Sequence, residues 1–326
     1  MALFDLPLPE LRTYRASTPE PPGFDDFWSG TIAAARQAAS PPKVAEVRTP
    51  LRGITSYDVT FSGYAGQPVK GWLSRPAGAT GPLPVVVEFI GYGGGRGLPI
   101  EWLLWPSAGY AHLVMDTRGQ GGNWRGGDTP DPDEHGAGPS SPGFLTRGVL
   151  APETHYYRRL ITDAVRAVDT AAELPDVDAS RLVVTGKSQG GALSLAAAGL
   201  NPEKVSAVVS GVPFLCDIRR AVTITDSDPF QEVVRFLRAN PNLAPQVLAT
   251  LDHIDVVHFA KRITAPAIVS VALMDAVCPP SGVFAAYNAI PDAAGKQIEV
   301  FEWDGHEGGR GFFDTTALEF VAGRLA

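Results

Sequence analysis

The stretch VVTGKSQGGALSLAAAG, residues 183–199, decides the fold. An apolar run that stops at Gly-Lys-Ser-Gln-Gly-Gly and continues as a row of small residues is typical of a strand that turns sharply into a helix. Gly186, Ser188 and Gly190 match G-x-S-x-G, the pattern of a serine exposed on a strained strand-to-helix turn. Glycine beside the serine lets strand and helix pass closely. The alternative is an ordinary glycine-rich connection between a strand and a helix.

Composition places the chain among well-packed globular proteins. Of its 326 residues 44% are hydrophobic and 19% are charged, and the net charge is −8. A large core is therefore possible, and the acidic balance disfavours a nucleic-acid partner. We find no apolar run long enough for a transmembrane helix and no signal-peptide pattern, so we expect a cytoplasmic protein without a membrane partner.

Cys216 and Cys278 show no metal spacing and are predicted to be free thiols, with a single disulfide as the alternative.

Six short apolar runs, each ending in glycine or a polar residue, predict strands buried on both faces of a sheet. The runs are LPVVVEFIG, AHLVMDTRG, RLVVTGKS, VSAVVSGVP, AIVSVALMD and KQIEVFEWDG. Helical segments between them, such as residues 156–174, require crossover connections. We therefore predict an α/β fold with a mostly parallel, doubly wound sheet and helices on both faces. Alternation around Gly66 predicts an antiparallel hairpin ahead of that sheet.

Three segments depart from this alternation. Residues 1–45 predict a proline-rich wrapping segment that contains one helix, FDDFWSGTIAAARQAA. Residues 123–150 predict a long turn-rich loop, and residues 215–262 a helical excursion. Excursions of this length are usually functional or interface elements. Because α/β sheets of this size often form one unit, we expect a single domain over residues 1–326.

A serine hydroxyl becomes a strong nucleophile only when an oriented base takes its proton. On this kind of fold the partners follow in the order Ser, then Asp or Glu, then His. That order leaves His253, His258 and His306 as candidate bases. The first two lie in the helical excursion and are interpreted as satisfied surface or interface histidines. His306 lies in FEWDGHEGG, a glycine-flanked loop after the last strand run, and is predicted to be the base.

The acid that orients this base is predicted to be Asp275. It ends the strand run AIVSVALMD, and the interval to His306 fits one helix and one strand. The rival is Asp304, which lies two positions before the histidine and would need an awkward local geometry. The predicted catalytic residues are therefore Ser188, Asp275 and His306.

The negative oxygen of an acyl-transfer intermediate needs two N–H donors, one after the nucleophile and one after an earlier strand. Gln189 supplies the first, and Tyr92 or Gly93, in EFIGYGGGRG, the second. The alternative for this loop is a dinucleotide cradle, which would need a full G-x-G-x-x-G register before a helix. We expect no cofactor and no metal. Arg118, in MDTRGQGGNW, is interpreted as structural, with substrate binding as the alternative.

Three motifs resemble the signatures of a known family. RGQGG at residues 118–122, GKSQGG at 186–191 and GHEGG at 305–309 resemble the acetyl xylan esterase and cephalosporin C deacetylase family, carbohydrate esterase family seven. Stretches such as TPEPPGFDDFW, VPFLCDIRRAV and MDAVCPPS extend the similarity over nearly the whole chain.

The resemblance implies an α/β-hydrolase fold and a serine esterase. Such an enzyme removes acetyl groups from small substrates, acetylated xylo-oligosaccharides or other sugars and cephalosporin C, through an acetyl-enzyme intermediate. The resemblance implies the same three catalytic residues, with the N–H groups of Tyr92 and Gln189 as the oxyanion donors. It also implies a doughnut-like hexamer whose active sites face an inner cavity.

Two positions depart from the family pattern, and two other functions stay open. Lys187 stands where a small or uncharged residue is commoner, and Gly122 replaces a commoner serine. Neither departure removes a catalytic group. The first rival function is a peptidase or a carboxylesterase for longer acyl chains. The second is a catalytically silent scaffold used for binding, which has no physical reason to retain all three catalytic positions.

Overall fold

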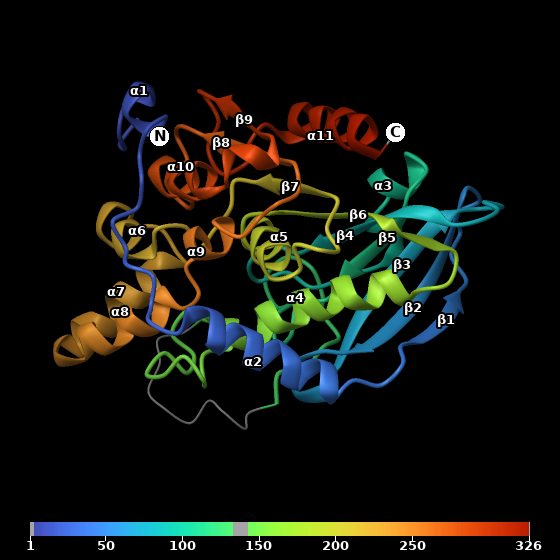
Figure 1. Cartoon of the computed structure of the whole chain (residues 1–326), viewed down its shortest axis with the longest axis horizontal. Helices are drawn as coiled ribbons and strands as arrows, with labels where there is room; N and C mark the ends of the chain where they lie inside the picture. The colour runs from blue at the N-terminus through green and yellow to red at the C-terminus, as the bar shows by residue number, and fades with distance from the viewer. Residues whose placement is uncertain (1–2, 133–142, 326) are drawn as a thin grey trace.

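The computed structural model describes residues 3–132 and 143–325, so the loop predicted at 123–150 lies partly outside the described residues. A nine-stranded sheet has the order β1-β2-β3-β5-β4-β6-β7-β8-β9 (Figure 1). Its strands are β1 (Lys43–Val47), β2 (Ile54–Ser62), β3 (Pro68–Pro76), β4 (Leu83–Phe89), β5 (Ala111–Met115), β6 (Val177–Lys187), β7 (Ala207–Gly211), β8 (Ala267–Ala272) and β9 (Lys296–Phe301). That the chain forms a single domain stays a prediction.

The six predicted apolar runs form the parallel part of the sheet. Every neighbouring pair from β5 through β4, β6, β7 and β8 to β9 is parallel. The predicted hairpin is β2 and β3, which pair antiparallel across the short helix η1 (Tyr64–Gly66). The edge strand β1 was not predicted, because its mostly exposed residues carry no apolar alternation.

Helices cover both faces of the sheet, as predicted (Figure 1). The larger core cluster joins the sheet to α4, α5, α9 and α10, and a smaller one joins the other face to α3 and α11. The helices of these layers are α3 (Leu104–Ser107), α4 (Tyr156–Glu173), α5 (Gln189–Leu200), α10 (Pro280–Ala289) and α11 (Arg310–Leu325). The remaining short helices beside them are η2 (Pro99–Glu101) and η4 (Asp292–Ala294).

The predicted excursion at 215–262 is helical, and the N-terminal segment wraps against it. Its helices are α6 (Ile218–Ile224), α7 (Phe230–Ala239), η3 (Pro241–Leu243), α8 (Ala244–Asp252) and α9 (Val256–Ala260). The N-terminal segment contains α1 (Leu8–Leu11) and α2 (Phe24–Gln37). Trp28 of α2 donates its indole N–H to the carbonyl of His253 at 3.0 Å, and Tyr14 donates to Asp217 at 2.7 Å. These bonds tie the two segments together.

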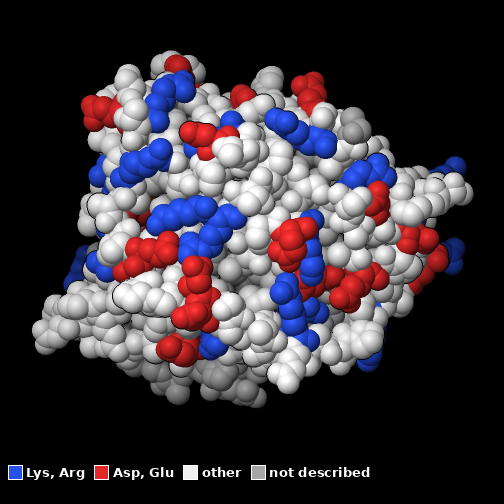
Figure 2. All heavy atoms as spheres, viewed as in Figure 1, with Lys and Arg blue, Asp and Glu red and all other residues white. Residues whose placement is uncertain are grey.

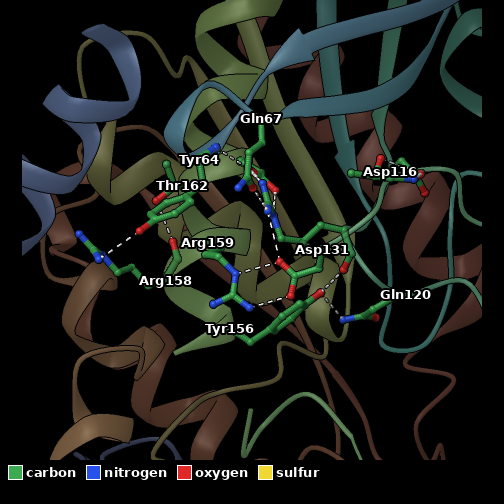
Figure 3. A network of polar contacts seen from close by, with 12 residues as sticks. Tyr64, Gln67, Asp116, Gln120, Asp131, Tyr156, Arg158, Arg159 and Thr162 are labelled. Carbon is green, nitrogen blue, oxygen red and sulfur yellow. Dashed lines mark hydrogen bonds and ion pairs between the residues drawn. The ribbon is translucent and has the colours of Figure 1, made fainter. Parts of the chain in front are cut away.

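Arg118 is structural, as interpreted. Its side chain is fully buried, and its Nε and Nη2 donate to the two carboxylate oxygens of Asp163 in α4 at 2.5 and 2.8 Å. Next to it Arg159 binds Asp131 through two bonds of 2.8 and 2.6 Å (Figure 3). Paired in this way, the buried charges anchor the loop after β5 to α4.

Charged side chains of both signs are mixed on the surface that Figure 2 shows. On the face shown in Figure 2, Lys and Arg side chains lie next to Asp and Glu and do not gather into one basic patch. Among the described helices, none combines the length and the apolar character that spanning a bilayer requires.

Candidate active site

Ser188 occupies the turn between β6 and α5. Its backbone angles are φ 57° and ψ −119°, a strained conformation for a residue with a side chain. Two backbone hydrogen bonds hold the turn: Ser188 N–H donates to the carbonyl of Gly211 at 2.9 Å, and its own carbonyl accepts from Phe214 at 3.0 Å. This is the geometry of a sharp strand-to-helix turn and not of an ordinary connection.

The glycines beside the serine are required by close backbone contacts. A Cβ at Gly190 would lie 2.1 Å from the carbonyl oxygen of Phe89 in β4. A Cβ at Gly186 would lie 2.4 Å from the carbonyl carbon of Gly190. No side chain fits at these distances, so the approach of β4, β6 and α5 that presents Ser188 depends on both glycines.

His306 and Asp275 form a hydrogen-bonded pair at the carboxyl ends of β9 and β8. His306 Nδ1 lies 2.9 Å from Oδ2 of Asp275, whose side chain is completely buried. The other oxygen, Oδ1, accepts the N–H groups of Val277 at 2.8 Å and Cys278 at 3.0 Å. These bonds orient the carboxylate, which in turn fixes the ring orientation of His306.

The alternative acid, Asp304, and the two alternative bases, His253 and His258, make other contacts. Oδ2 of Asp304 accepts the N–H of Gly309 at 2.8 Å, so this carboxylate braces the loop that carries His306. His253 binds the carbonyl of Ala249 at 2.9 Å, as interpreted. His258 does not fit the interpretation as a satisfied surface or interface histidine. It is completely buried against α2 of the N-terminal segment, and its Nε2 has no hydrogen-bond partner among the described residues.

Ser188 and His306 line the same pocket. Among the described residues, no hydrogen bond joins the serine hydroxyl to the imidazole; the hydroxyl lies 3.9 Å from Sγ of Cys278. Hydrogen bonds between a nucleophile and its base are often long in unliganded enzymes and tighten when substrate binds. Sequence reasoning missed Cys278 as a neighbour of Ser188, although it follows Asp275 by three positions.

One group of side chains in the described part of the chain has metal-ligand spacing. Ligand atoms of Asp275, Cys278 and His306 lie within 4.8 Å of one another. Burial raises the pKa of the Cys278 thiol, whereas metals bind the thiolate. Both oxygens of Asp275 already accept hydrogen bonds. The donor set therefore suits an acid–base pair better than a metal.

The loop after β4 meets the start of α5, as an oxyanion site requires. Gly93 N–H donates to Oε1 of Gln120 at 2.7 Å, so of the two predicted donors this one is already engaged and Tyr92 remains. Gln189 is the first residue of α5, where N–H groups have no acceptor within the helix. Its side chain donates to the carbonyl of Ile90 at 3.0 Å and holds the two loops together.

Gln120, in the RGQGG motif, is hydrogen-bonded to both the loop after β4 and the start of α5. Its Nε2 donates to the hydroxyl of Tyr156 at 3.0 Å (Figure 3). The same atom donates to Oε1 of Gln189 at 2.9 Å. Tyr157 donates to the same Gln189 oxygen at 2.9 Å. Sequence reasoning assigned no role to Gln120, although its place in a signature motif was an available signal.

Glu232, from α7 of the excursion, braces Tyr92 from the other side. Its carboxylate accepts the hydroxyl of Tyr92 and, at 2.9 Å, the N–H of Leu145. The Tyr92 hydroxyl also accepts the N–H of Phe144 at 2.7 Å. Burial raises the pKa of Glu232 to about 7. No sequence motif marks this residue, because only the tertiary fold brings α7 to the loop after β4.

The pocket above Ser188 measures about 630 Å³. Lys187, the unusual residue of the GKSQGG motif, lies in its wall and pairs with Asp314 of α11 at 3.0 Å. The carboxylate of Asp314 therefore balances the positive charge of Lys187. Trp124, half exposed at the pocket, donates its indole N–H to the carbonyl of Tyr92 at 2.9 Å.

The mostly parallel sheet, the strained serine turn after a central strand and the His–Asp pair on later loops together define an α/β-hydrolase. Comparison with known proteins narrows this class. The chain matches the acetyl xylan esterase (AXE1) family over residues 1–324. It therefore belongs to the acetyl xylan esterase family, whose members are carboxylic-ester hydrolases.

Individual relatives agree with this assignment. An acetyl xylan esterase from Paenibacillus sp. R4 has a TM-score of 0.90 and 39% identity, with 98% of this chain and 100% of that chain covered. Acetyl xylan esterase 1 from Thermoanaerobacterium sp. JW/SL YS485 has a TM-score of 0.90 and 33% identity, with 99% and 100% covered. The acetyl esterase Axe7A of Xylanibacter ruminicola is 30% identical over 281 residues, or 84% of this chain. The chain spans 61% of that curated relative.

Proposed function

We propose that this protein is a serine esterase that removes acetyl groups from small acetylated sugars through an acetyl-enzyme intermediate. The observation that carries the proposal is the strained turn at Ser188 in the same pocket as the His306–Asp275 pair. Membership of the acetyl xylan esterase family supports the acyl group and the substrate class.

The proposal assigns a role to each residue of the site. Ser188 Oγ attacks the ester carbonyl while His306 accepts its proton, and Asp275 stabilises the imidazolium that forms. The N–H groups of Tyr92 and Gln189 bind the negative oxygen of the tetrahedral intermediate. His306 returns the proton to the departing alcohol, and a water molecule activated by the same base then hydrolyses the acetyl-enzyme.

Substitution of the nucleophile tests the proposal. Ser188→Ala should reduce hydrolysis of 4-nitrophenyl acetate by roughly five to six orders of magnitude. Ser29→Ala, on the exposed face of α2, is the matched control and should keep the wild-type rate. Near-normal turnover by Ser188→Ala would rule out the assignment.

A chain-length series separates acetyl esterase from the two rival hydrolase functions. Rates on 4-nitrophenyl acetate, butyrate and octanoate should fall steeply with length if the acyl site is small. Retained activity on octanoate would favour the longer-chain carboxylesterase, and cleavage of an acylated peptide the peptidase. Cephalosporin C, which carries an acetyl ester on an anionic alcohol part, is the further substrate that the family resemblance adds.

Assembly is a separate part of the proposal. We propose a hexamer because the family resemblance implies one and because large apolar side chains are exposed near the pocket. These are Leu98, Ile100, Leu103 and Leu104. Light scattering coupled to size-exclusion chromatography tests it, and a monomeric mass at micromolar concentration would contradict it. A cytoplasmic location stays a prediction. The two unbridged cysteines, Cys216 and Cys278, are consistent with it, because thiols stay reduced in that compartment.

A further inference from the structure

Three polar side chains interrupt the apolar strands on one face of the sheet. Glu88 in β4 and Thr185 in β6 are direct neighbours across the parallel pair. His112 in β5 is the neighbour of Val86, two residues before Glu88 and therefore on the same face. Strands buried on both faces are normally apolar throughout. Ser74 of β3, the neighbour of His112 on this face, is polar too, but its hydroxyl is hydrogen-bonded to that of Ser56. Glu88, His112 and Thr185 differ from it because they line the pocket.

The layer over these residues is incomplete. Between β4 and β5 the chain forms only η2 and the four-residue α3, while α11 lies over β7 and β8 on the same face. The pocket that contains Ser188 extends into the space between α3 and α11, and Glu88, His112 and Thr185 line it. We call this part of the pocket the α3–α11 cleft. It connects the three polar residues to the nucleophile within one cavity.

The size of the pocket shows that it holds more than an acyl group. About 630 Å³ falls in the range of pockets that enclose drug-sized ligands. A two-carbon acetyl group fills only a small part of that volume. The remainder must accommodate either water or the alcohol part of the ester.

The polar groups of the cleft have unused hydrogen-bonding capacity. Nε2 of His112 lies 2.9 Å from Oε2 of Glu88, whose side chain is 24% exposed. Among the described residues, both ring nitrogens of His112 are enclosed by protein and neither meets the geometry of a hydrogen bond. No hydrogen bond to the Thr185 hydroxyl is formed within the described residues either. Buried polar groups without partners are costly, and a hydroxyl-bearing ligand could bond to the Thr185 hydroxyl and to the partly exposed Glu88 carboxylate.

The charges of the pocket favour a neutral ligand. Its wall contains four carboxylates and two Lys or Arg side chains. One of the carboxylates, Asp228, pairs with Arg235 at 2.6 Å, and Glu88 is the one that has no Lys or Arg partner among the described residues. Both cations are already paired, Lys187 with Asp314 at 3.0 Å and Arg125 with Glu101 at 3.1 Å. A ligand carboxylate would therefore meet repulsion and find no unpaired Lys or Arg in the wall. Neutral hydroxyls would find acceptors, and the half-exposed ring of Trp124 offers an apolar surface for the C–H face of a sugar ring.

We propose that the α3–α11 cleft binds the alcohol part of the substrate and selects a neutral, polyhydroxylated ring. Glu88, oriented by His112, and Thr185 form hydrogen bonds to its free hydroxyl groups. The cleft discriminates against alcohol parts that carry a carboxylate, such as that of cephalosporin C. This inference rests on the proposed esterase function and adds the residues that determine its specificity.

Ratios of kcat/KM on three acetyl esters test the inference. The substrates are xylobiose carrying one acetyl group, cephalosporin C and 4-nitrophenyl acetate, whose alcohol part has no free hydroxyl. Thr185→Val keeps the shape of the side chain and removes its hydroxyl. It should lower the acetyl-xylobiose to 4-nitrophenyl acetate ratio by about tenfold. Glu88→Gln should lower the same ratio and raise the cephalosporin C to acetyl-xylobiose ratio at least about threefold, because one negative charge is removed.

Glu46→Gln, on the exposed edge strand β1, is the matched control and should leave both ratios at their wild-type values. Ratios unchanged within about twofold in Thr185→Val and Glu88→Gln would overturn the inference, since a purely structural role alters all substrates alike. Failure of the proposed function would look different, because Ser188→Ala would then retain activity on every ester.

Discussion

Nδ1 of His306 lies 2.9 Å from Oδ2 of Asp275, thirty-one residues earlier in the chain. The acid that is closest in sequence, Asp304, instead accepts the N–H of Gly309. The two carboxylates therefore have different roles. Asp275 orients the imidazole of His306, and Asp304 holds the shape of the loop that carries this histidine. This division can be tested by paired substitutions.

Asp275→Asn should lower kcat for 4-nitrophenyl acetate by roughly three to four orders of magnitude. The amide can no longer stabilise the imidazolium and can hold the wrong tautomer of His306. Asp304→Asn is the control, since an amide oxygen still accepts the N–H of Gly309, and its kcat should stay within about threefold of wild type. A larger loss in Asp304→Asn than in Asp275→Asn would reverse the assignment.

Gln120→Leu should lower kcat by roughly tenfold with little change in KM. The substitution removes the acceptor for Gly93 N–H and the donor to Gln189, so both sides of the oxyanion site lose a brace. Gln246→Leu, at an exposed position of α8, is the matched control. Steady-state kinetics on 4-nitrophenyl acetate measure both. An effect confined to KM would show that Gln120 acts on substrate binding instead.

Glu232 should make stability depend on pH. Burial raises its folded-state pKa from 4.5 to about 7, so the folded protein binds this proton more tightly than the unfolded chain. The stabilisation is therefore complete below about pH 4.5 and is lost as the pH rises through 7. Between pH 5 and pH 8 the wild type should lose roughly 2 kcal/mol more unfolding free energy than Glu232→Gln.

Urea denaturation at the two pH values measures this difference. Glu46→Gln controls for the loss of an exposed carboxylate. Equal pH dependence in the wild type and Glu232→Gln would show that Glu232 is ionised throughout this range in the folded state.

Gly190→Ala should destabilise the protein by about 3 kcal/mol and abolish most activity, because its Cβ would collide with the carbonyl oxygen of Phe89. Gly122 offers the contrast. A Cβ there meets no atom within 4 Å, so Gly122→Ser, which restores the residue commoner in the family, should leave stability and activity unchanged. Thermal unfolding and the 4-nitrophenyl acetate assay distinguish the two. A stable, active Gly190→Ala would show that β4 and α5 can move apart.

Much of the fold could be predicted from local pattern. The apolar runs of β4 to β9 and the hairpin of β2 and β3 carry their own periodicity, so a mostly parallel sheet with crossovers follows from elementary rules. The order of the strands was not predicted. The edge strand β1 has mostly exposed residues, and no period distinguishes it from a loop. The buried position of His258 was missed because the helix that covers it, α2, lies more than two hundred residues earlier.

Some features of the candidate site could likewise be predicted from the sequence, and others depend on the tertiary structure. The chain order of Ser188, Asp275 and His306 and the glycines of the turn are properties of the sequence, because steric demands at a sharp turn and the crossover rule leave few alternatives. Only the tertiary structure brought Glu232 to Tyr92, Gln120 to Gly93, and Cys278 to Ser188. Contacts between distant segments depend on how whole layers pack, and no local period or motif encodes that packing.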